Sequence, residues 1–272
     1  MITSRSQRWR ERRARWAADE AVIDPSGYSV DVLEPDRARR FIADHHYLPN
    51  YPAARLAVGL FGRRAALEGV AVFAVPATNA VVTRHTGFDD ADRGCVLARL
   101  ILLDSVPQNG ESFFVSRAFR RLRCERPRIE AVVSYSDPLA GHIGRVYAAL
   151  SGAHRGMSPA RTVFAIGPTT IAGRTLSKIR IGERGHGGAI DQLVKLGAPR
   201  PGIMESPTAW LWRLERERHL VKRRHPGLFT YCFELTREAR RLGRALPRLP
   251  YPKSLPVSEP ELPFDRCAAL PF

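Results

Sequence analysis

The sequence predicts a mixed α/β fold in which one central twisted sheet carries helices on both faces. Apolar runs of strand length recur along the chain, amphipathic stretches of helix length separate them, and turn-forming residues mark the boundaries. The length of 272 residues allows one large domain with a buried core, and a hydrophobic fraction of 44% is ordinary for a globular protein.

Residues 1–27 predict a basic N-terminal arm. Trp9 and Trp16 stand seven residues apart, which places both indoles on one face of a helix with arginines around the rest. The tryptophans fit docking of this helix on the body of the protein, and the arginines fit a path along DNA phosphates; the two interpretations are compatible. The arginines concerned are Arg8, Arg10, Arg12 and Arg13.

The first half of the folded region reads as a helix, a hairpin and a buried strand. Residues 36–47 have helical spacing, and Pro49 stops the helix. Residues 55–60 and 66–75 are alternating or apolar and flank a glycine-containing turn, which predicts two hairpin strands. The nearly continuous apolar run 96–103 predicts a strand that is buried on both faces.

The second half alternates helices and strands and ends in a proline-rich tail. The expected helices are 112–122, 144–150, 187–197 and 206–224, and the expected strands are 130–134, 162–166 and 228–235. The segment after residue 246 is rich in proline, with Pro247, Pro250, Pro252, Pro256, Pro260 and Pro263 among its residues, which predicts an extended segment without a core of its own. The expected division is an arm (1–27), a folded domain (28–245) and a tail (246–272).

The charge favours a polyanionic partner. Lys and Arg number 43 against 27 Asp and Glu, a net charge of +16, and nucleic acid is the polyanion that such a surplus favours. An arginine-rich proteome is the alternative, and a membrane surface fits less well. No apolar run is long enough to cross a bilayer, no secretory signal is recognisable, and the four scattered cysteines are typical of a reducing cytoplasm.

The loop 106–112 joins the buried strand to the next helix. Backbone N–H groups at a helix start, together with Gly110, make a place for an anion such as the pyrophosphate of an acyl-CoA donor. Glu111 is an unfavourable neighbour for phosphate. An ordinary turn with Asn109 or Ser112 as N-cap explains the same residues equally well.

Polar side chains gather after the next strand and at the end of the first helix. Asp137, His142 and Tyr147 follow the predicted strand 130–134, and His46 and Tyr47 stand at the end of the predicted helix 36–47. Carboxylate, imidazole and phenolate groups are ligands for iron or another first-row metal. From composition alone the other interpretation is favoured, with half-buried tyrosines and Asp137 as a helix cap.

Arg99 stands inside the apolar strand, where an arginine is rare unless it is paired. It either pairs with Glu111 or Asp104 or binds an anionic group of a donor molecule.

Together these segments resemble the Mom family of DNA-modification proteins, known from phage Mu and its relatives. The resemblance runs from about residue 33 to 180 and more loosely through 229–235, and it rests on the order and spacing of several short blocks. These blocks are His45-His46-Tyr47, the run 94–100 around Arg99, Asn109 to Ser112, Ser134 to Asp137, and Gly141 to Tyr147.

The resemblance implies a fold similar to GNAT N-acetyltransferases and conversion of adenine in DNA to N6-carbamoylmethyl-adenine, which protects the DNA from restriction. It implies iron and an acyl-type donor, with acetyl-CoA suggested. By matching position, Tyr47, Asp137 and Tyr147 are expected to be catalytic and, with His46, to form the metal cluster. The donor site is expected to hold Arg99, Asn109, Gly110 and Ser112.

One departure concerns the donor. The GNAT phosphate loop carries several glycines, and residues 107–112 hold one. A carbamoylmethyl group also contains a nitrogen that acetyl lacks, so a glycine-derived donor is the alternative.

The expected function is therefore transfer of a small group to N6 of adenine in double-stranded DNA, in the cytoplasm of a bacterial host, by a phage- or prophage-encoded enzyme. Arginines of the arm and Arg218, Arg223 and Arg224 are expected to grip phosphates. Two alternatives stay open: a GNAT-like N-acetyltransferase for a protein or small-molecule amine, and a non-catalytic basic DNA-binding protein. The expected partners are DNA and a small-molecule donor, without a membrane; whether the protein is a homodimer stays open.

Overall fold

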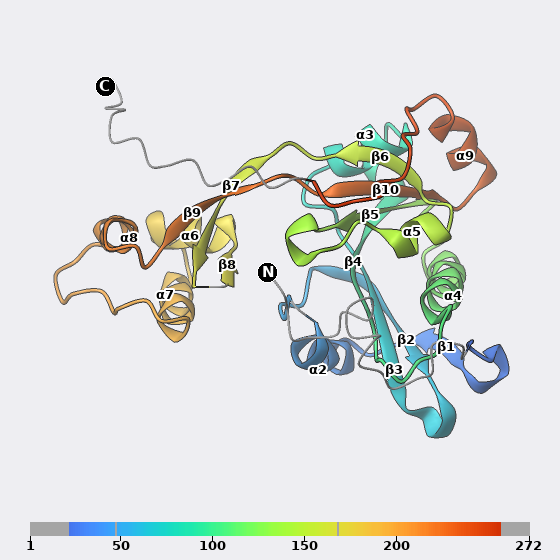
Figure 1. Ribbon diagram of the computed structural model, residues 1–272, viewed down its shortest axis with the longest axis horizontal. Coiled ribbons are helices and arrows are strands. Elements are labelled where there is room, and N and C mark those ends of the chain that lie inside the picture. Colours follow the sequence, from blue (N-terminus) through green and yellow to red (C-terminus); the bar gives the residue numbers. More distant parts are fainter. Residues whose placement is uncertain (1–21, 47, 168, 257–272) are drawn as a thin grey trace. The chain divides into compact units, whose positions relative to one another are not determined.

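The computed structural model describes residues 22–46, 48–167 and 169–256 and divides into two compact units (Figure 1). The described part of the larger unit comprises the chain up to Ser158 and residues 228–255, and the smaller unit contains Pro159–Gly227. The smaller unit is therefore an insertion between two segments of the larger one. Among the described residues, no helix has the length and apolarity needed to cross a membrane.

The larger unit is built on a seven-stranded sheet with the order β1-β2-β3-β4-β5-β10-β6. Every neighbouring pair is antiparallel except β4 and β5, which are parallel. The strands are β1 (Ser29–Val32), β2 (Ala54–Phe61), β3 (Leu67–Ala74), β4 (Gly94–Leu102), β5 (Ala131–Ser136), β6 (Ala153–Met157) and β10 (Phe229–Glu234).

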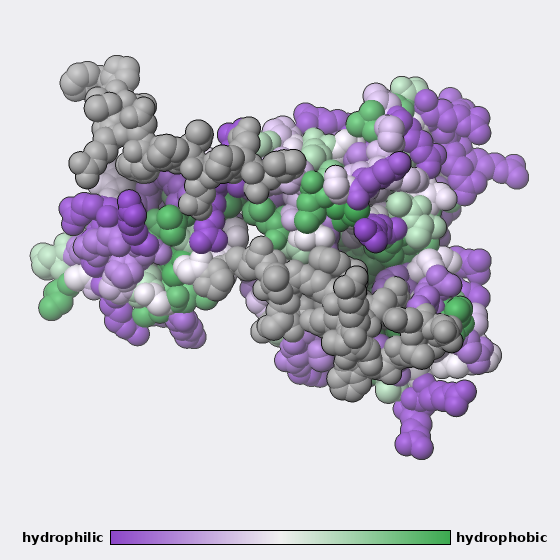
Figure 2. Space-filling view, in the orientation of Figure 1, coloured by the Kyte–Doolittle hydropathy of each residue, from purple (hydrophilic) through white to green (hydrophobic). Residues whose placement is uncertain are grey.

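Helices cover both faces of this sheet because its strands alternate their apolar side chains. In β2, Val58 and Leu60 enter the core below α4 (Gly110–Glu125) and α5 (Arg145–Ala149), whereas Ala57 faces α2 (Pro35–His45). In β10, Tyr231 joins the first core, whereas Cys232 packs below α3 (Ala80–Thr86) and α9 (Arg237–Gly243). The outer surface of α9 is hydrophilic (Figure 2).

The two parallel strands stay together only at their beginnings. β4 pairs with β5 from Gly94↔Ala131 to Leu97↔Ser134, and its later residues pair with β3 alone. The register between β3 and β4 shifts after Arg99, which leaves Ala98 as a bulge. Figure 1 shows β4 running between the group β1–β3 and the group β5, β10 and β6. The carboxyl-terminal halves of β4 and β5 are therefore not paired with each other.

An ion pair locks the closed end of this pair of strands. The Arg93 guanidinium contacts the Glu130 carboxylate at 2.8 Å, and the Glu130 backbone N–H donates to the Arg93 carbonyl at 2.7 Å. The Thr236 hydroxyl also donates to Glu130, and the Arg93 guanidinium lies 4.2 Å from the Phe88 ring centroid. Because both charged side chains are mostly buried, this pair fixes the register where β4 and β5 begin.

The smaller unit has its own sheet and its own core. Its three strands have the order β8-β7-β9, and its core centres on the fully buried Trp210, whose indole N–H donates to the Pro199 carbonyl at 2.9 Å. The elements are β7 (Arg161–Ile166), β8 (Thr169–Ile171), β9 (Val221–His225), α6 (Gly173–Arg180), α7 (His186–Lys195) and α8 (Pro207–Arg216).

The predicted fold class is confirmed, since a mixed sheet carries helices on both faces. The predicted helix 206–224 is wrong beyond Arg216: Arg218 adopts a left-handed conformation with φ 60°, and residues from Val221 form β9 against β7. The pattern of charged residues does not distinguish a helix from an exposed edge strand. Pairing with β7 makes residues 221–225 a strand. Arg223 and Arg224 accordingly stand on a strand, not a helix.

The predicted arm lies outside the described residues apart from 22–27, and most of the predicted tail lies outside them too. The described start of the tail contacts β6: the Leu249 N–H donates to the His154 carbonyl at 2.9 Å, and Arg155 donates to the carbonyls of Leu246 and Pro247. The expected limits of arm, catalytic domain and tail stay a prediction.

A test of this packing uses Gly144, the residue before α5. Its φ is +78°, and an added Cβ would lie 2.4 Å from the Tyr231 ring. We expect Gly144→Ala to destabilise the larger unit by roughly 2 kcal/mol or more, since strain and overpacking act together. Thermal melting followed by near-ultraviolet circular dichroism measures this. Gly27→Ala, with only one atom within 4 Å, is the control that should melt like the parent protein.

Candidate active site

The candidate site lies where the parallel strands β4 and β5 end. Ligands of α/β proteins bind outside the carboxyl ends of parallel strands. Here the chain leaves β4 through the loop 103–109 into α4, and it leaves β5 through the turn η5 (Pro138–Ala140) into α5. All predicted catalytic and donor-site residues that the structure describes follow or flank these two strand ends, except Arg99, which lies within β4, and His46, which ends α2.

The β4 side presents a tightly packed helix start. Asn109 occupies the N-cap position of α4 with φ 64° and makes no side-chain capping bond. Ser112 donates its hydroxyl to the Asn109 carbonyl at 3.0 Å. A Cβ on Gly110 would lie 2.5 Å from Cγ1 of Val106, so this glycine serves close packing of the loop on the helix. The position of the predicted cap is therefore confirmed, without its side-chain bond.

Arg99 ties β4 to the segment that follows α2. One terminal nitrogen donates to the Asn50 carbonyl at 2.8 Å and the other to the Ala98 carbonyl at 2.7 Å. His46, which ends α2, is buried, and its Nδ1 accepts the Leu48 N–H at 2.9 Å. Tyr47 lies outside the described residues.

The β5 side supplies a carboxylate and a buried hydroxyl. Asp137 is half-buried, and its Oδ1 accepts the Leu139 N–H at 2.8 Å, which confirms the capping interpretation and holds the carboxylate at the strand end. The Ser136 hydroxyl is buried and has no hydrogen-bond partner within the described ranges.

Tyr147 belongs to α5, and its side chain is buried. Its ring centroid is 5.3 Å from that of Tyr231 and 6.0 Å from that of Phe233. Burial raises the pKa of Tyr147 above its usual value of 10, and the Ser134 hydroxyl opposes part of this shift. Burial, followed by the nearby Tyr147, raises the pKa of Tyr231 to about 12. Both groups are therefore neutral phenols at physiological pH.

The described residues do not by themselves fit an iron site. Within the described ranges no group of three or more His, Cys, Asp or Glu side chains converges. His46 ends a helix that packs on one face of the sheet, whereas Tyr147 belongs to the core on the other face.

The loop 103–109 also does not fit a pyrophosphate. Val106 occupies the space beside Gly110, the glycine at the start of α4. Glu111 places a negative charge in the first turn of the same helix. A like charge there disfavours an anion.

Sequence reasoning missed Tyr231 and His154. The Tyr231 hydroxyl donates to the Ile143 carbonyl at 2.5 Å and thereby holds the turn between Asp137 and Tyr147. The His154 Nδ1 lies 2.6 Å from the Pro250 carbonyl, and its ring lies 5.3 Å from that of Tyr231. Tyr231 lies in the predicted apolar strand 228–235, whereas His154 lies in β6, which the sequence did not predict, so only the pairing of β10 with β6 reveals the cluster.

The predicted DNA contacts that the structure describes lie in the smaller unit. Arg218, Arg223 and Arg224 are exposed, and Arg223 donates to the Gly167 carbonyl at 3.2 Å. The 69 residues of Pro159–Gly227 hold 13 Lys or Arg against 5 Asp or Glu, so this unit is strongly basic.

Comparison with solved structures finds acetyltransferases at low sequence identity. A spermidine/spermine N-acetyltransferase from Vibrio cholerae, solved with manganese ions, is 9% identical, covers 79% of this chain and 97% of its own, and has a TM-score of 0.41. A ribosomal-protein-S5-alanine acetyltransferase from Vibrio fischeri is 11% identical, covers 52% and 87%, and has a TM-score of 0.35.

Among curated proteins no match is found. The sequence profile of the Mom protein family matches residues 27–185, which is more than half of the chain. The matched span contains β4, β5, the Asp137 turn and Tyr147. The predicted family is therefore confirmed: this chain belongs to the Mom protein family.

Proposed function

We propose that this protein modifies DNA by converting adenine in the double strand to N6-carbamoylmethyl-adenine, and thereby protects that DNA from restriction. The observation that carries the proposal is the family match, since residues 27–185 include every predicted catalytic residue. The arrangement of Asp137 and Tyr147 around the end of β5 supports it.

The chemistry requires help because N6 of adenine is a poor nucleophile, its lone pair being delocalised into the ring. The base must also leave the stack to reach a site at the end of a strand, which costs a few kcal/mol. The basic surface of the smaller unit, with Arg218, Arg223 and Arg224, supports a grip on phosphates that offsets this cost.

Asp137 is the proposed general base. Its cap to the Leu139 N–H fixes the carboxylate through one oxygen, and the side chain stays partly accessible. As N6 attacks, the proton of N6 passes to this carboxylate, the bond between N6 and the methylene carbon of the donor forms, and the bond from that carbon to the leaving group breaks.

Tyr147 is the proposed hydrogen-bond donor. Its burial keeps the phenol protonated, so it can donate to an acceptor of the substrate but cannot take up a proton. Of the two candidate bases, we therefore propose the carboxylate.

The proposed donor is a glycine-derived small molecule that carries the whole carbamoylmethyl group on a leaving group. Acetyl lacks the nitrogen of the product. Arg99, Asn109, Gly110 and Ser112 keep their proposed place beside this donor, because they line the β4 side of the parted strands.

The first experiment is mass spectrometry of nucleosides from the DNA of cells that express this protein. We expect a nucleoside heavier than deoxyadenosine by a carbamoylmethyl group. Unmodified adenine beside abundant, folded protein contradicts the proposal. Acetylation of a protein or polyamine in the same cells then identifies the N-acetyltransferase alternative, and salt-sensitive DNA binding without any product identifies the non-catalytic one.

Replacement of Asp137 by Asn separates catalysis from folding. The Asn side-chain oxygen still accepts the Leu139 N–H, so η5 keeps its cap, but the base is gone. We expect loss of the modified nucleoside by about 100-fold or more, with DNA affinity unchanged. Equal loss of modification and of DNA binding contradicts the assigned role.

The pH dependence of the modification rate distinguishes the two bases. Because the pKa of Tyr147 lies above its usual value of 10, this phenol stays protonated and the rate should be flat between about pH 7.5 and 9.5. A tyrosinate base would instead give a rate that rises about tenfold per pH unit in this range. Single-turnover rates on one duplex across this range make the measurement.

A further inference from the structure

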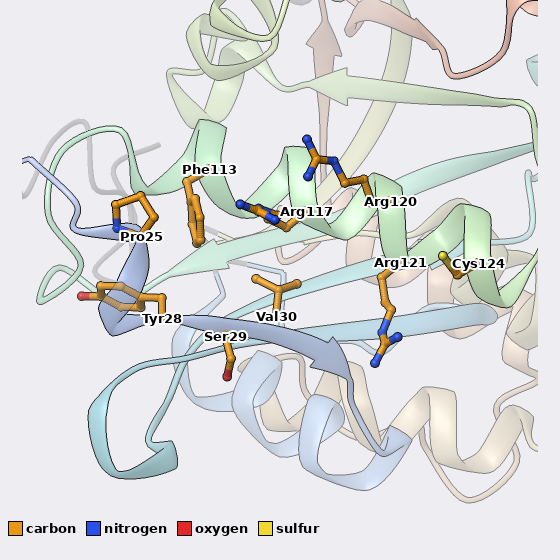
Figure 3. A pocket seen from close by; sticks show the side chains of 9 residues that line it. All are labelled: Pro25, Tyr28, Ser29, Val30, Phe113, Arg117, Arg120, Arg121 and Cys124. Atoms are coloured by element: carbon orange, nitrogen blue, oxygen red, sulfur yellow. The ribbon is translucent and has the colours of Figure 1, made fainter.

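A groove in the larger unit runs between α4 and the start of the chain's first strand (Figure 3). It has a volume of about 440 Å³, and none of the described residues that line it is Asp or Glu. The lining residues are Pro25, Tyr28, Ser29, Val30, Phe113, Arg117, Arg120, Arg121 and Cys124. Phe113, Arg117, Arg120 and Cys124 follow one another on α4 at intervals of three and four residues, and Arg121 adjoins Arg120, so one face of the helix forms the wall.

Two of the three arginines in this wall keep their charge available. Arg117 and Arg120 are exposed and have no carboxylate partner within the described ranges, whereas Arg121 is paired with Asp31. Other arginines of this unit are used in the structure, such as Arg93 with Glu130 and Arg155 with Glu234. Since a free guanidinium is a bidentate partner for phosphate, the groove offers two anion contacts one helical turn apart.

The end of the groove near the start of α4 is aromatic. Figure 3 shows Tyr28 and Phe113 at this end and Cys124 at the opposite end. The Arg117 guanidinium lies 5.5 Å from the Phe113 ring centroid, so cationic and ring surfaces adjoin. Arginine beside an aromatic ring is typical of surfaces that bind both the phosphate and the base or sugar of a nucleic acid.

We propose that this groove binds the DNA substrate, with Arg117 and Arg120 on backbone phosphates and Tyr28 and Phe113 against a sugar or base. The inference rests on the proposed function and adds a contact surface outside the strongly basic smaller unit. The aromatic end adjoins the first turn of α4, which is also the β4 side of the candidate site. A strand held in the groove is therefore directed toward the carboxyl ends of β4 and β5.

Cys124 allows a test on the unaltered protein, because it is exposed whereas Cys95 and Cys232 are buried. We expect a 20-base-pair duplex to protect Cys124 from N-ethylmaleimide as DNA approaches saturation, measured by peptide mapping. The buried cysteines report unfolding. Unchanged labelling of Cys124 at saturating DNA overturns the proposal, as does protection by ATP without protection by DNA, which would assign the groove to a free nucleotide.

A charge-matched pair of variants tests the arginines. The double variant Arg117→Ala/Arg120→Ala should lower the slope of log affinity against log salt by about 2, since each phosphate contact contributes about 0.9. Arg237→Ala/Arg241→Ala removes the same charge from the exposed surface of α9 and should change the slope little. Equal losses in both variants overturn the proposal, because total charge alone would then explain binding.

The outcomes separate this inference from the proposed function. Protection of Cys124 with no modified nucleoside leaves the groove standing and removes the proposed reaction. Modified adenine without protection of Cys124 supports the proposed reaction and removes the groove as the DNA-binding surface. Phe113→Leu, which keeps an apolar side chain packed on the core but loses the ring, should weaken DNA binding without lowering the melting temperature.

Discussion

The limited pairing of β4 with β5 is the constraint on which the site depends. Parallel strands that pair along their whole length leave no room at their sides, but here pairing ends at Leu97↔Ser134. The Arg93–Glu130 pair holds the beginnings of the strands together, and the bulge at Ala98 turns the rest of β4 toward β3. The two strands are paired where they begin and separate where they end. The start of α4 at Asn109 follows the end of β4, and the turn at Asp137 follows the end of β5.

Close packing then holds each side of the site. Val106 occupies the space that a side chain at position 110 would need, and the Tyr231 ring occupies the space that a side chain at position 144 would need. The Tyr231 hydroxyl, bonded to the Ile143 carbonyl, fixes the turn that carries the chain from Asp137 to Tyr147. Such contacts tolerate little movement because protein interiors are packed at near-crystal density. The site is therefore positioned by the core of the sheet as well as by its polar residues.

Much of this fold follows from sequence pattern, and the exceptions have physical causes. The hairpin β2–β3, the buried β4 and the helix α4 carry long periodic signals, and all three are present. The segment Ala80–Thr86 is rich in β-branched residues yet forms α3, because Val82 packs on Phe88 and Ala131. The part of the site that pattern could not reveal is Tyr231, since its role depends on strands far apart in sequence.

The same distinction applies to charge. A net charge of +16 predicts a polyanion partner but does not say which arginines meet it. Arg155 is almost fully buried against Glu234 and backbone carbonyls, and Arg213 grips Glu205 with a bidentate pair, so both stabilise the protein itself. Only arginines that remain exposed without a carboxylate, such as Arg117 and Arg120, can release counterions when DNA binds. Fewer arginines are therefore available to the proposed DNA contact than the composition implies, and the two on α4 belong to the helix that begins beside the candidate site.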